Sequence, residues 1–179
     1  MTTTRIPLLV SAIALIAGCA STPSATQSNT AIVDAGGRVT RTKEVGIPFR
    51  YEAARDEVWA ALLSAYRDVG LEPDVIDTDG NVVARTRLPM RRVFNGSRVS
   101  QLFSCGDTPT GSPVADAGQV VASVRSQIGG EFDHPVVSTL VDAYVIPDGG
   151  GSSTGLRCGS SGTIEGWIDA KVKQRLGAR

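Results

Sequence analysis

Apolar residues at helical spacing near both ends of a long strand-like region constrain the fold most strongly. Over residues 53–69 the apolar positions recur three or four residues apart, at Val58, Leu62, Tyr66 and Val69. That spacing predicts a helix with one buried face. Because such a face is stable only when another layer covers it, the rest of the chain must supply that layer.

A second helix is predicted over residues 163–176, with Ser160 or Ser161 as its cap. Its apolar stripe comprises Ile164, Trp167, Ile168, Val172 and Leu176. Trp59 in the first helix and Trp167 in the second lie on these stripes. We therefore expect both rings to be buried against the same sheet.

The region between the helices has strand composition interrupted by turn residues. Strands are predicted over residues 39–49, 72–77, 81–87, 98–104, 119–128 and 136–146, with a last strand ending at 158. Loops rich in Gly, Pro, Ser and Asp are expected over 106–117 and 147–155. The segment 77–81, Asp-Thr-Asp-Gly-Asn, indicates a hairpin turn rather than a calcium loop. The pattern predicts an α+β fold: an antiparallel sheet of about five to six strands with two helices packed on one face.

The N-terminal segment has the features of an export signal. Arg5 precedes an apolar stretch from Ile6 to Ile16, which is broken only by Pro7 and Ser11. Its length suits the hydrophobic region of a signal peptide and is too short for a membrane-spanning helix. An ordinary secreted protein and a buried core segment are the alternative interpretations.

The residues Ile16-Ala17-Gly18-Cys19 resemble a bacterial lipobox. The resemblance implies cleavage before Cys19, a thioether from its thiol to diacylglycerol, and acylation, typically by palmitate, of its new amino group. Residues 1–18 would be the signal peptide, 19–38 the lipidated Cys with a flexible Ser/Thr-rich tether, and 39–179 a single α+β domain. In the Gram-negative lipoproteins that this segment resembles, an Asp directly after the lipidated Cys favours retention in the inner membrane. Ala20-Ser21 contain no Asp, so the resemblance implies the periplasmic face of the outer membrane. The outer face of the cytoplasmic membrane is the alternative.

Two parts of the domain resemble the helix-grip domains of envelope lipoproteins such as the barrel-assembly accessory lipoprotein BamC. The similar parts are residues 48–87, with a helix carrying Val58-Trp59 and Leu62, and residues 158–176 with the closing helix. The resemblance implies a helix-grip-like arrangement and carries over no catalytic residue.

Cys105 and Cys158 remain after Cys19 is lipidated, and each ends a predicted strand before a glycine. An even pair in an exported chain predicts a disulfide, and the strand ends should then be neighbours. A redox pair or a metal site is the alternative. However, the chain has no C-x-x-C motif, and His134 is its single histidine. We predict neither a metal nor a cofactor.

Five arginines gather over a short stretch, although the chain as a whole has a net charge of 0. The chain is neutral, and a single aromatic residue among these arginines, Phe94, is not the aromatic interleaving that would indicate nucleic-acid binding. The local charge is either a solvated surface or a contact with an anionic partner, such as lipid head groups or an anionic envelope polymer. The cluster consists of Arg85, Arg87, Arg91, Arg92 and Arg98.

Two functions from different classes follow. The first is a membrane-tethered, non-enzymatic interaction or scaffolding domain, an accessory to envelope assembly that contacts an envelope protein or polymer. The second is an envelope hydrolase or small-ligand binder that uses the groove between sheet and helices. The sequence contains no recognisable catalytic set, so we expect no catalysis.

Overall fold

The computed structural model of the protein describes residues 26–33, 39–148 and 155–177. Outside these residues lie the predicted signal peptide, Cys19, the parts of the predicted tether at 20–25 and 34–38, and most of the predicted loop at 147–155. The elements are, in order, β1 (Thr26–Val33), β2 (Val39–Arg50), α1 (Arg55–Asp68), β3 (Val75–Asp77), β4 (Val82–Met90), β5 (Val93–Phe94), β6 (Ser97–Arg98), α2 (Val99–Leu102), β7 (Phe103–Ser104), α3 (Val114–Ala117), β8 (Gly118–Gly130), β9 (Pro135–Pro147), β10 (Leu156–Ser160) and α4 (Thr163–Arg175).

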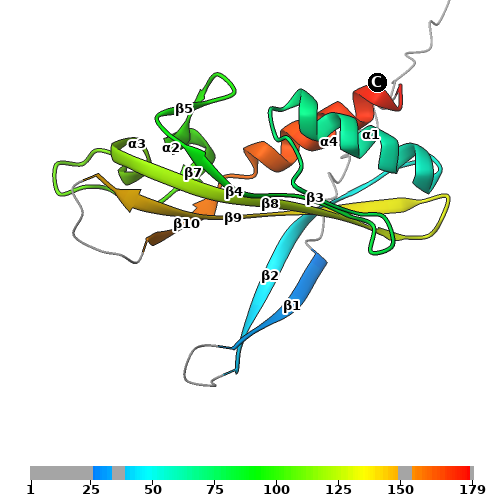
Figure 1. The fold of residues 1–179 in the computed structure, drawn as a ribbon, viewed down its shortest axis with the longest axis horizontal. Helices are drawn as coiled ribbons and strands as arrows, with labels where there is room; N and C mark the ends of the chain where they lie inside the picture. Colours follow the sequence, from blue (N-terminus) through cyan, green and yellow to red (C-terminus); the bar gives the residue numbers. More distant parts are fainter. Residues whose placement is uncertain (1–25, 34–38, 149–154, 178–179) are drawn as a thin grey trace, which may run out of the picture.

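The predicted α+β class and antiparallel sheet are confirmed. Among the described residues, eight strands form one sheet in the order β1-β2-β9-β8-β4-β3, and β10 pairs with both β9 and β7. The long hairpin of β8 and β9 forms its centre, with thirteen residue pairs from Gly118↔Pro147 to Gly130↔Pro135. α1 and α4 lie side by side on one face of this sheet (Figure 1).

The core lies between the sheet and the two long helices. The stripe predicted for the first helix is buried: Val58, Leu62 and Tyr66 have no exposed surface, and Val69 has 2%. The Glu57 side chain accepts a hydrogen bond from the backbone N–H of Ala54 at 3.2 Å, which stabilises the start of α1. From the sheet, alternate residues of β8 and β9 point into the core.

The expectation that both tryptophans are buried is only partly correct. Trp59 and Trp167 pack against the core but remain half-exposed. Trp59 directly follows Val58, which lies at the centre of the apolar stripe of α1. Trp167 directly precedes Ile168, which lies at the centre of the stripe of α4. A neighbouring position is rotated by about 100° around the helix, which places the ring at the flank of the buried face.

The strand predicted over residues 98–104 is wrong for most of its length. Residues 99–102 form the short helix α2, whereas Arg98 ends the strand β6 and Phe103 and Ser104 form β7. Val99 and Leu102 are both fully buried, and their spacing of three places them on one side of a helical turn. The Gln101 side chain also accepts the backbone N–H of Arg98 at 3.2 Å, which closes the first turn.

Part of the segment predicted as a flexible tether forms a strand. β1 pairs with β2 from Thr26↔Gly46 to Val33↔Val39. The backbone ladder needs no buried apolar face, and Thr, Ile and Val in this segment have high strand propensity. The tether is predicted because the segment has too few apolar residues to form a core, and this criterion does not detect a strand held by backbone hydrogen bonds.

The predicted disulfide is present in the structure. Cys105 and Cys158 are joined, with their Cα atoms 4.3 Å apart. The adjacency expected from this pairing is also present, because β7 pairs with β10 through Gly159↔Ser104 and Ser160↔Phe103. The disulfide therefore links the segment before the 106–117 loop to β10, the strand before α4.

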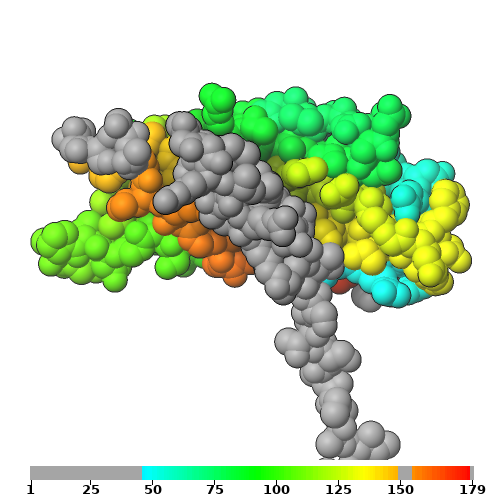
Figure 2. All heavy atoms as spheres, turned by 90° about the horizontal axis from the view of Figure 1, so that it is seen from below, coloured from blue at the N-terminus to red at the C-terminus, as the bar shows by residue number. Residues whose placement is uncertain are grey.

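The sheet face opposite the helices carries both polar and apolar side chains, Ile146 among them with 41% exposed. Arg125, Gln127 and Asp142 are exposed on it, beside the partly exposed ring of Tyr144. Figure 2 looks onto this side, with the turn of the β8–β9 hairpin in yellow at the right. Within the described residues, no helix is long and apolar enough to cross a membrane.

Candidate functional site

The structure divides the arginine cluster into members with and without acidic partners. The Arg85 guanidinium lies 3.7 Å from the carboxylate of Asp74, and that of Arg91 lies 3.3 Å from Asp148. The hydroxyl of Thr86 donates a hydrogen bond to Asp74, and this bond is the main cause of the lowered pKa of that carboxyl group. Arg85 and Arg91 are therefore engaged in ion pairs on the surface.

Arg87 occupies an irregular position in β4. The register of β4 against β8 shifts between Arg85 and Leu88, and Arg87 has a φ of +46°. Its backbone N–H donates to the Ser123 hydroxyl at 3.2 Å, and its side chain is exposed. The bulge thus turns this side chain toward solvent.

Arg92 and Arg98 flank the small hairpin of β5 and β6, above the sheet on the side of the helices (Figure 1). Asn95 and Gly96 form its turn with φ values of +46° and +78°, as a two-residue turn of this kind requires. Phe94 packs against the core and anchors the hairpin. The N–H of Val99 donates to the carbonyl of Arg92 at 2.9 Å, which holds the two ends of the hairpin together.

A cavity of about 380 Å³ lies beside this hairpin, lined by Arg92, Val93, Arg98 and Asp116. We call it the arginine pocket. The Asp116 carboxylate is held by α2, because the N–H and the hydroxyl of Ser100 donate to its two oxygens at 3.0 and 2.7 Å. Two arginines and one aspartate with an anchored carboxylate thus line the arginine pocket.

Two buried acids on α4 were missed by the sequence analysis. Glu165 is 3% exposed and Asp169 is 9% exposed, on the face of the helix that packs on the core. The only sequence signal is their spacing of four beside the apolar stripe, which is equally typical of a solvated helix face. Their burial is set by the neighbours that tertiary packing provides.

Glu165 belongs to the start of α4. The Ser160 hydroxyl donates to its carboxylate at 2.8 Å and accepts the N–H of Gly162 at 3.1 Å. Burial raises the pKa of Glu165, against the lowering effect of a backbone hydrogen bond to its carboxylate and of the hydrogen bond from Ser160. The cap expected at Ser160 or Ser161 is shifted by a residue: Gly162, with a φ of +84°, is the N-cap of α4.

Asp169 connects α4 to the end of β2. Its carboxylate accepts the hydroxyl of Tyr51 at 2.9 Å and the ammonium of Lys173 at 2.8 Å. Lys173 also lies 5.7 Å from the centre of the Phe49 ring. Burial and the neighbouring carboxylate raise the pKa of Tyr51. These contacts pair the buried charge and fix α4 over the sheet.

Polar side chains also lie in the core, between α1 and the centre of the sheet. The Tyr66 hydroxyl is 2.9 Å from the Ser126 hydroxyl, which is 2.7 Å from that of Thr139. The Tyr66 hydroxyl is also 3.2 Å from the carbonyl of Val83. Because each group has a partner within the protein, this cluster is a structural element of the core.

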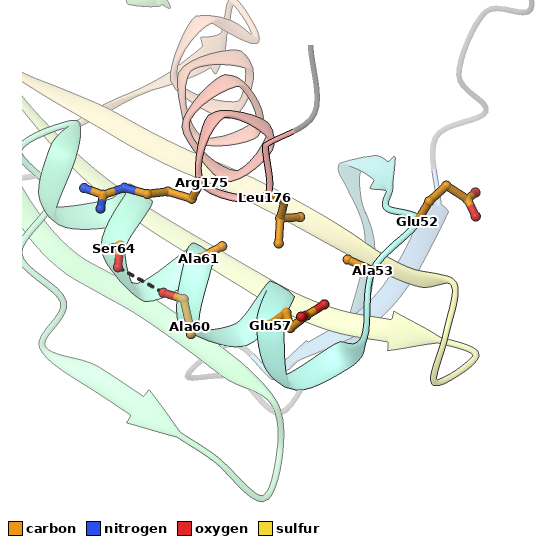
Figure 3. Close-up of a pocket in the computed structure, with 8 residues that line it drawn as sticks. All are labelled: Glu52, Ala53, Glu57, Ala60, Ala61, Ser64, Arg175 and Leu176. Carbon is orange, nitrogen blue, oxygen red and sulfur yellow. Dashed lines mark hydrogen bonds between the residues drawn. The ribbon is translucent and has the colours of Figure 1, made fainter.

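A groove of about 470 Å³ lies between α1 and the end of α4 (Figure 3). Ser64 and Arg175, two of its polar residues, are hydrogen-bonded to α1. The Ser64 hydroxyl donates to the Ala60 carbonyl at 3.0 Å, and Arg175 makes a two-pronged contact with Asp68. The lining consists of Glu52, Ala53, Glu57, Ala60, Ala61, Ser64, Arg175 and Leu176.

The described residues contain no group of three or more His, Cys, Asp or Glu side chains placed to hold a metal ion. The segment 77–81 forms the predicted turn, in which the Asp77 carboxylate accepts the N–H of Gly80 at 2.9 Å.

Comparisons with known proteins identify no family. No family model matches the chain, and no curated protein matches it. Among solved structures, CalU16 from Micromonospora echinospora is similar to this chain with 13% identity and a TM-score of 0.33, over 87% of this chain and 86% of that one. A TM-score this low supports no conclusion about function.

Proposed function

We propose that the protein is a membrane-anchored bacterial envelope lipoprotein with a non-enzymatic interaction or scaffolding domain that assists envelope assembly. The observation that carries this proposal is the apolar segment that ends in Ile16-Ala17-Gly18-Cys19. Two acyl chains on Cys19 would anchor the chain stably, whereas one alone binds membranes marginally. On this proposal the protein lies at the periplasmic face of the outer membrane.

The disulfide and the filled core support this proposal. A bond between Cys105 and Cys158 suits an oxidising compartment outside the cytoplasm. A ligand binder or hydrolase working between sheet and helices would need a cavity there. In the structure Leu62 and Tyr66 of α1 fill that space against Val124 of β8, all of them fully buried.

The test is the mature N-terminus of protein extracted from membranes. Intact-mass spectrometry should find a chain that begins at Cys19 and carries diacylglycerol and a fatty acyl group. Cys19→Ser should leave uncleaved precursor without lipid, whereas Ser21→Ala, a neighbouring control, should change neither cleavage nor lipidation. Wild-type protein with another N-terminus, or without acyl mass, would contradict the proposal.

A further inference from the structure

We propose that the arginine pocket binds one phosphate group, carried by a lipid head group or by a free phosphate ester. This inference rests on the proposed envelope function and narrows the anionic partner to one kind of chemical group. It also assigns the predicted contact with the anionic partner to two of the five clustered arginines, Arg92 and Arg98.

Arg92 and Arg98 line the same cavity, and the backbone of the hairpin holds them beside each other. Arg92 immediately precedes β5, and Arg98 ends β6, where it pairs with Val93. The bond from the Val99 N–H to the Arg92 carbonyl fixes the separation of these two positions. A guanidinium has five donors in a planar fork that matches the oxygens of phosphate, so two of them can hold one phosphate from two sides.

The charges of Arg92 and Arg98 lack compensation within the described part of the chain. Neither guanidinium lies within 4 Å of a described carboxylate, in contrast to Arg85 beside Asp74 and Arg91 beside Asp148. Asp116 shares the pocket, but both of its oxygens already accept hydrogen bonds from Ser100. The pocket therefore keeps a net positive charge that attracts an anion.

Arg92 also has an unusual backbone conformation. Its φ of +57° lies in the left-handed region, which asparagine and glycine adopt more readily than arginine. Strained positions of this kind concentrate at ligand sites. Beside it, Val93 is 58% exposed at the wall of the pocket, where it could contact the apolar part of a phospholipid.

The test uses the full chain, purified from membranes in a neutral detergent, with the arginine side-chain N–H signals followed by NMR. Inorganic phosphate is titrated in one series, and phosphatidylglycerol in mixed micelles in another, with phosphatidylcholine as the zwitterionic reference. We expect saturable shifts of two arginine signals, and at least about tenfold weaker binding in the Arg92→Gln, Arg98→Gln double variant. The control, Arg85→Gln with Arg91→Gln, removes the same charge and should change the affinity less than about twofold.

The backbone strain provides a second measurement. Arg92→Asn should keep or raise the thermal midpoint while weakening phosphate binding, because asparagine tolerates the left-handed region. This variant separates loss of binding from loss of folding.

The outcomes distinguish the ligand sources and the two proposals. Shifts with phosphatidylglycerol but not with phosphate identify a lipid ligand, and shifts with both identify phosphate itself as sufficient. Equal loss in both double variants, or no saturable shift with either probe, would overturn the site. If the wild-type protein lacks an acyl group but still binds phosphate, the proposed anchoring fails and the site remains. If the protein is lipidated but binds neither probe, the phosphate site fails and the proposed anchoring remains.

Discussion

Replacing the buried polar cluster of Tyr66, Ser126 and Thr139 in steps should show that its members depend on one another. All three side chains are at most 1% exposed, so none can recover a lost hydrogen bond from water. Ser126 is the central member, because its hydroxyl lies 2.9 Å from Tyr66 and 2.7 Å from Thr139. Its removal leaves the Thr139 hydroxyl without its partner.

The single variants should therefore differ in cost. Tyr66→Phe and Thr139→Val each remove one end of the chain of hydrogen bonds, and each should lower the free energy of unfolding by about 1–2 kcal/mol. Ser126→Ala should cost about 2–3 kcal/mol, since it breaks both contacts and leaves a buried polar group unpaired. The triple variant should lie within about 1 kcal/mol of the wild type, because it replaces every member with an apolar group of similar shape.

Urea unfolding followed by circular dichroism measures these free energies. Ser138→Ala is the matched control, because Ser138 neighbours Thr139 in β9 but lies on the opposite face of the sheet; we expect a change within about 0.5 kcal/mol. A triple variant whose loss equals the sum of the three single losses would refute the reasoning. Additivity would mean that the hydroxyls act independently.

Three further predictions concern other elements. Replacing both Cys105 and Cys158 with Ala should lower the free energy of unfolding by about 4 kcal/mol in the chain-entropy model for a separation of 53 residues. Urea unfolding of this variant, and of the wild type with and without reductant, should show that the fold persists without the disulfide; a variant midpoint equal to that of the oxidised wild type would contradict the prediction. Trp59→Ala and Trp167→Ala should each cost about 1–3 kcal/mol, less than the 3–5 kcal/mol of a fully buried ring, since both are half-exposed; a larger loss in thermal unfolding would show that the rings are more deeply packed. The raised pKa of Glu165 means that its charged form destabilises the fold. This loss of stability grows as the pH rises from the pKa of Glu165 in the unfolded protein to its pKa in the folded protein, and it remains constant at higher pH. Glu165→Gln should therefore stabilise the protein at pH 7, and the gain should shrink as the pH is lowered through that window; a gain that is constant with pH would argue against the titration of Glu165.

The sequence alone determines the two long helices, the central hairpin and the disulfide. Apolar residues that recur every 3.6 positions in a helix, or every second position in a strand, indicate which face of that element is buried. This pattern can be recognised within the element's own sequence. Val58, Leu62 and Tyr66 illustrate it, because their spacing suffices to place them in the core. The pairing of Cys105 with Cys158 follows equally from counting the cysteines of a chain whose N-terminal segment predicts export.

Short elements and extended polar segments are less well determined. The alternation of Val99, Gln101 and Phe103 favours a strand, while the burial of Val99 and Leu102 is satisfied by a turn of helix. A stretch of seven residues is compatible with both periods, and the packing against the rest of the core decides between them. The strand β1 similarly exists because β2 offers it a partner.

Which polar groups meet is decided by the tertiary structure. Arg91 and Arg92 are adjacent in sequence, but among the described residues only Arg91 of the two lies within 4 Å of a carboxylate, that of Asp148, 57 residues away. Ser126 meets Thr139 because the register of β8 and β9 places them opposite each other. Hydrogen bonds and ion pairs act over a few ångströms, so their partners are set by the relative positions of distant segments, which no local pattern encodes.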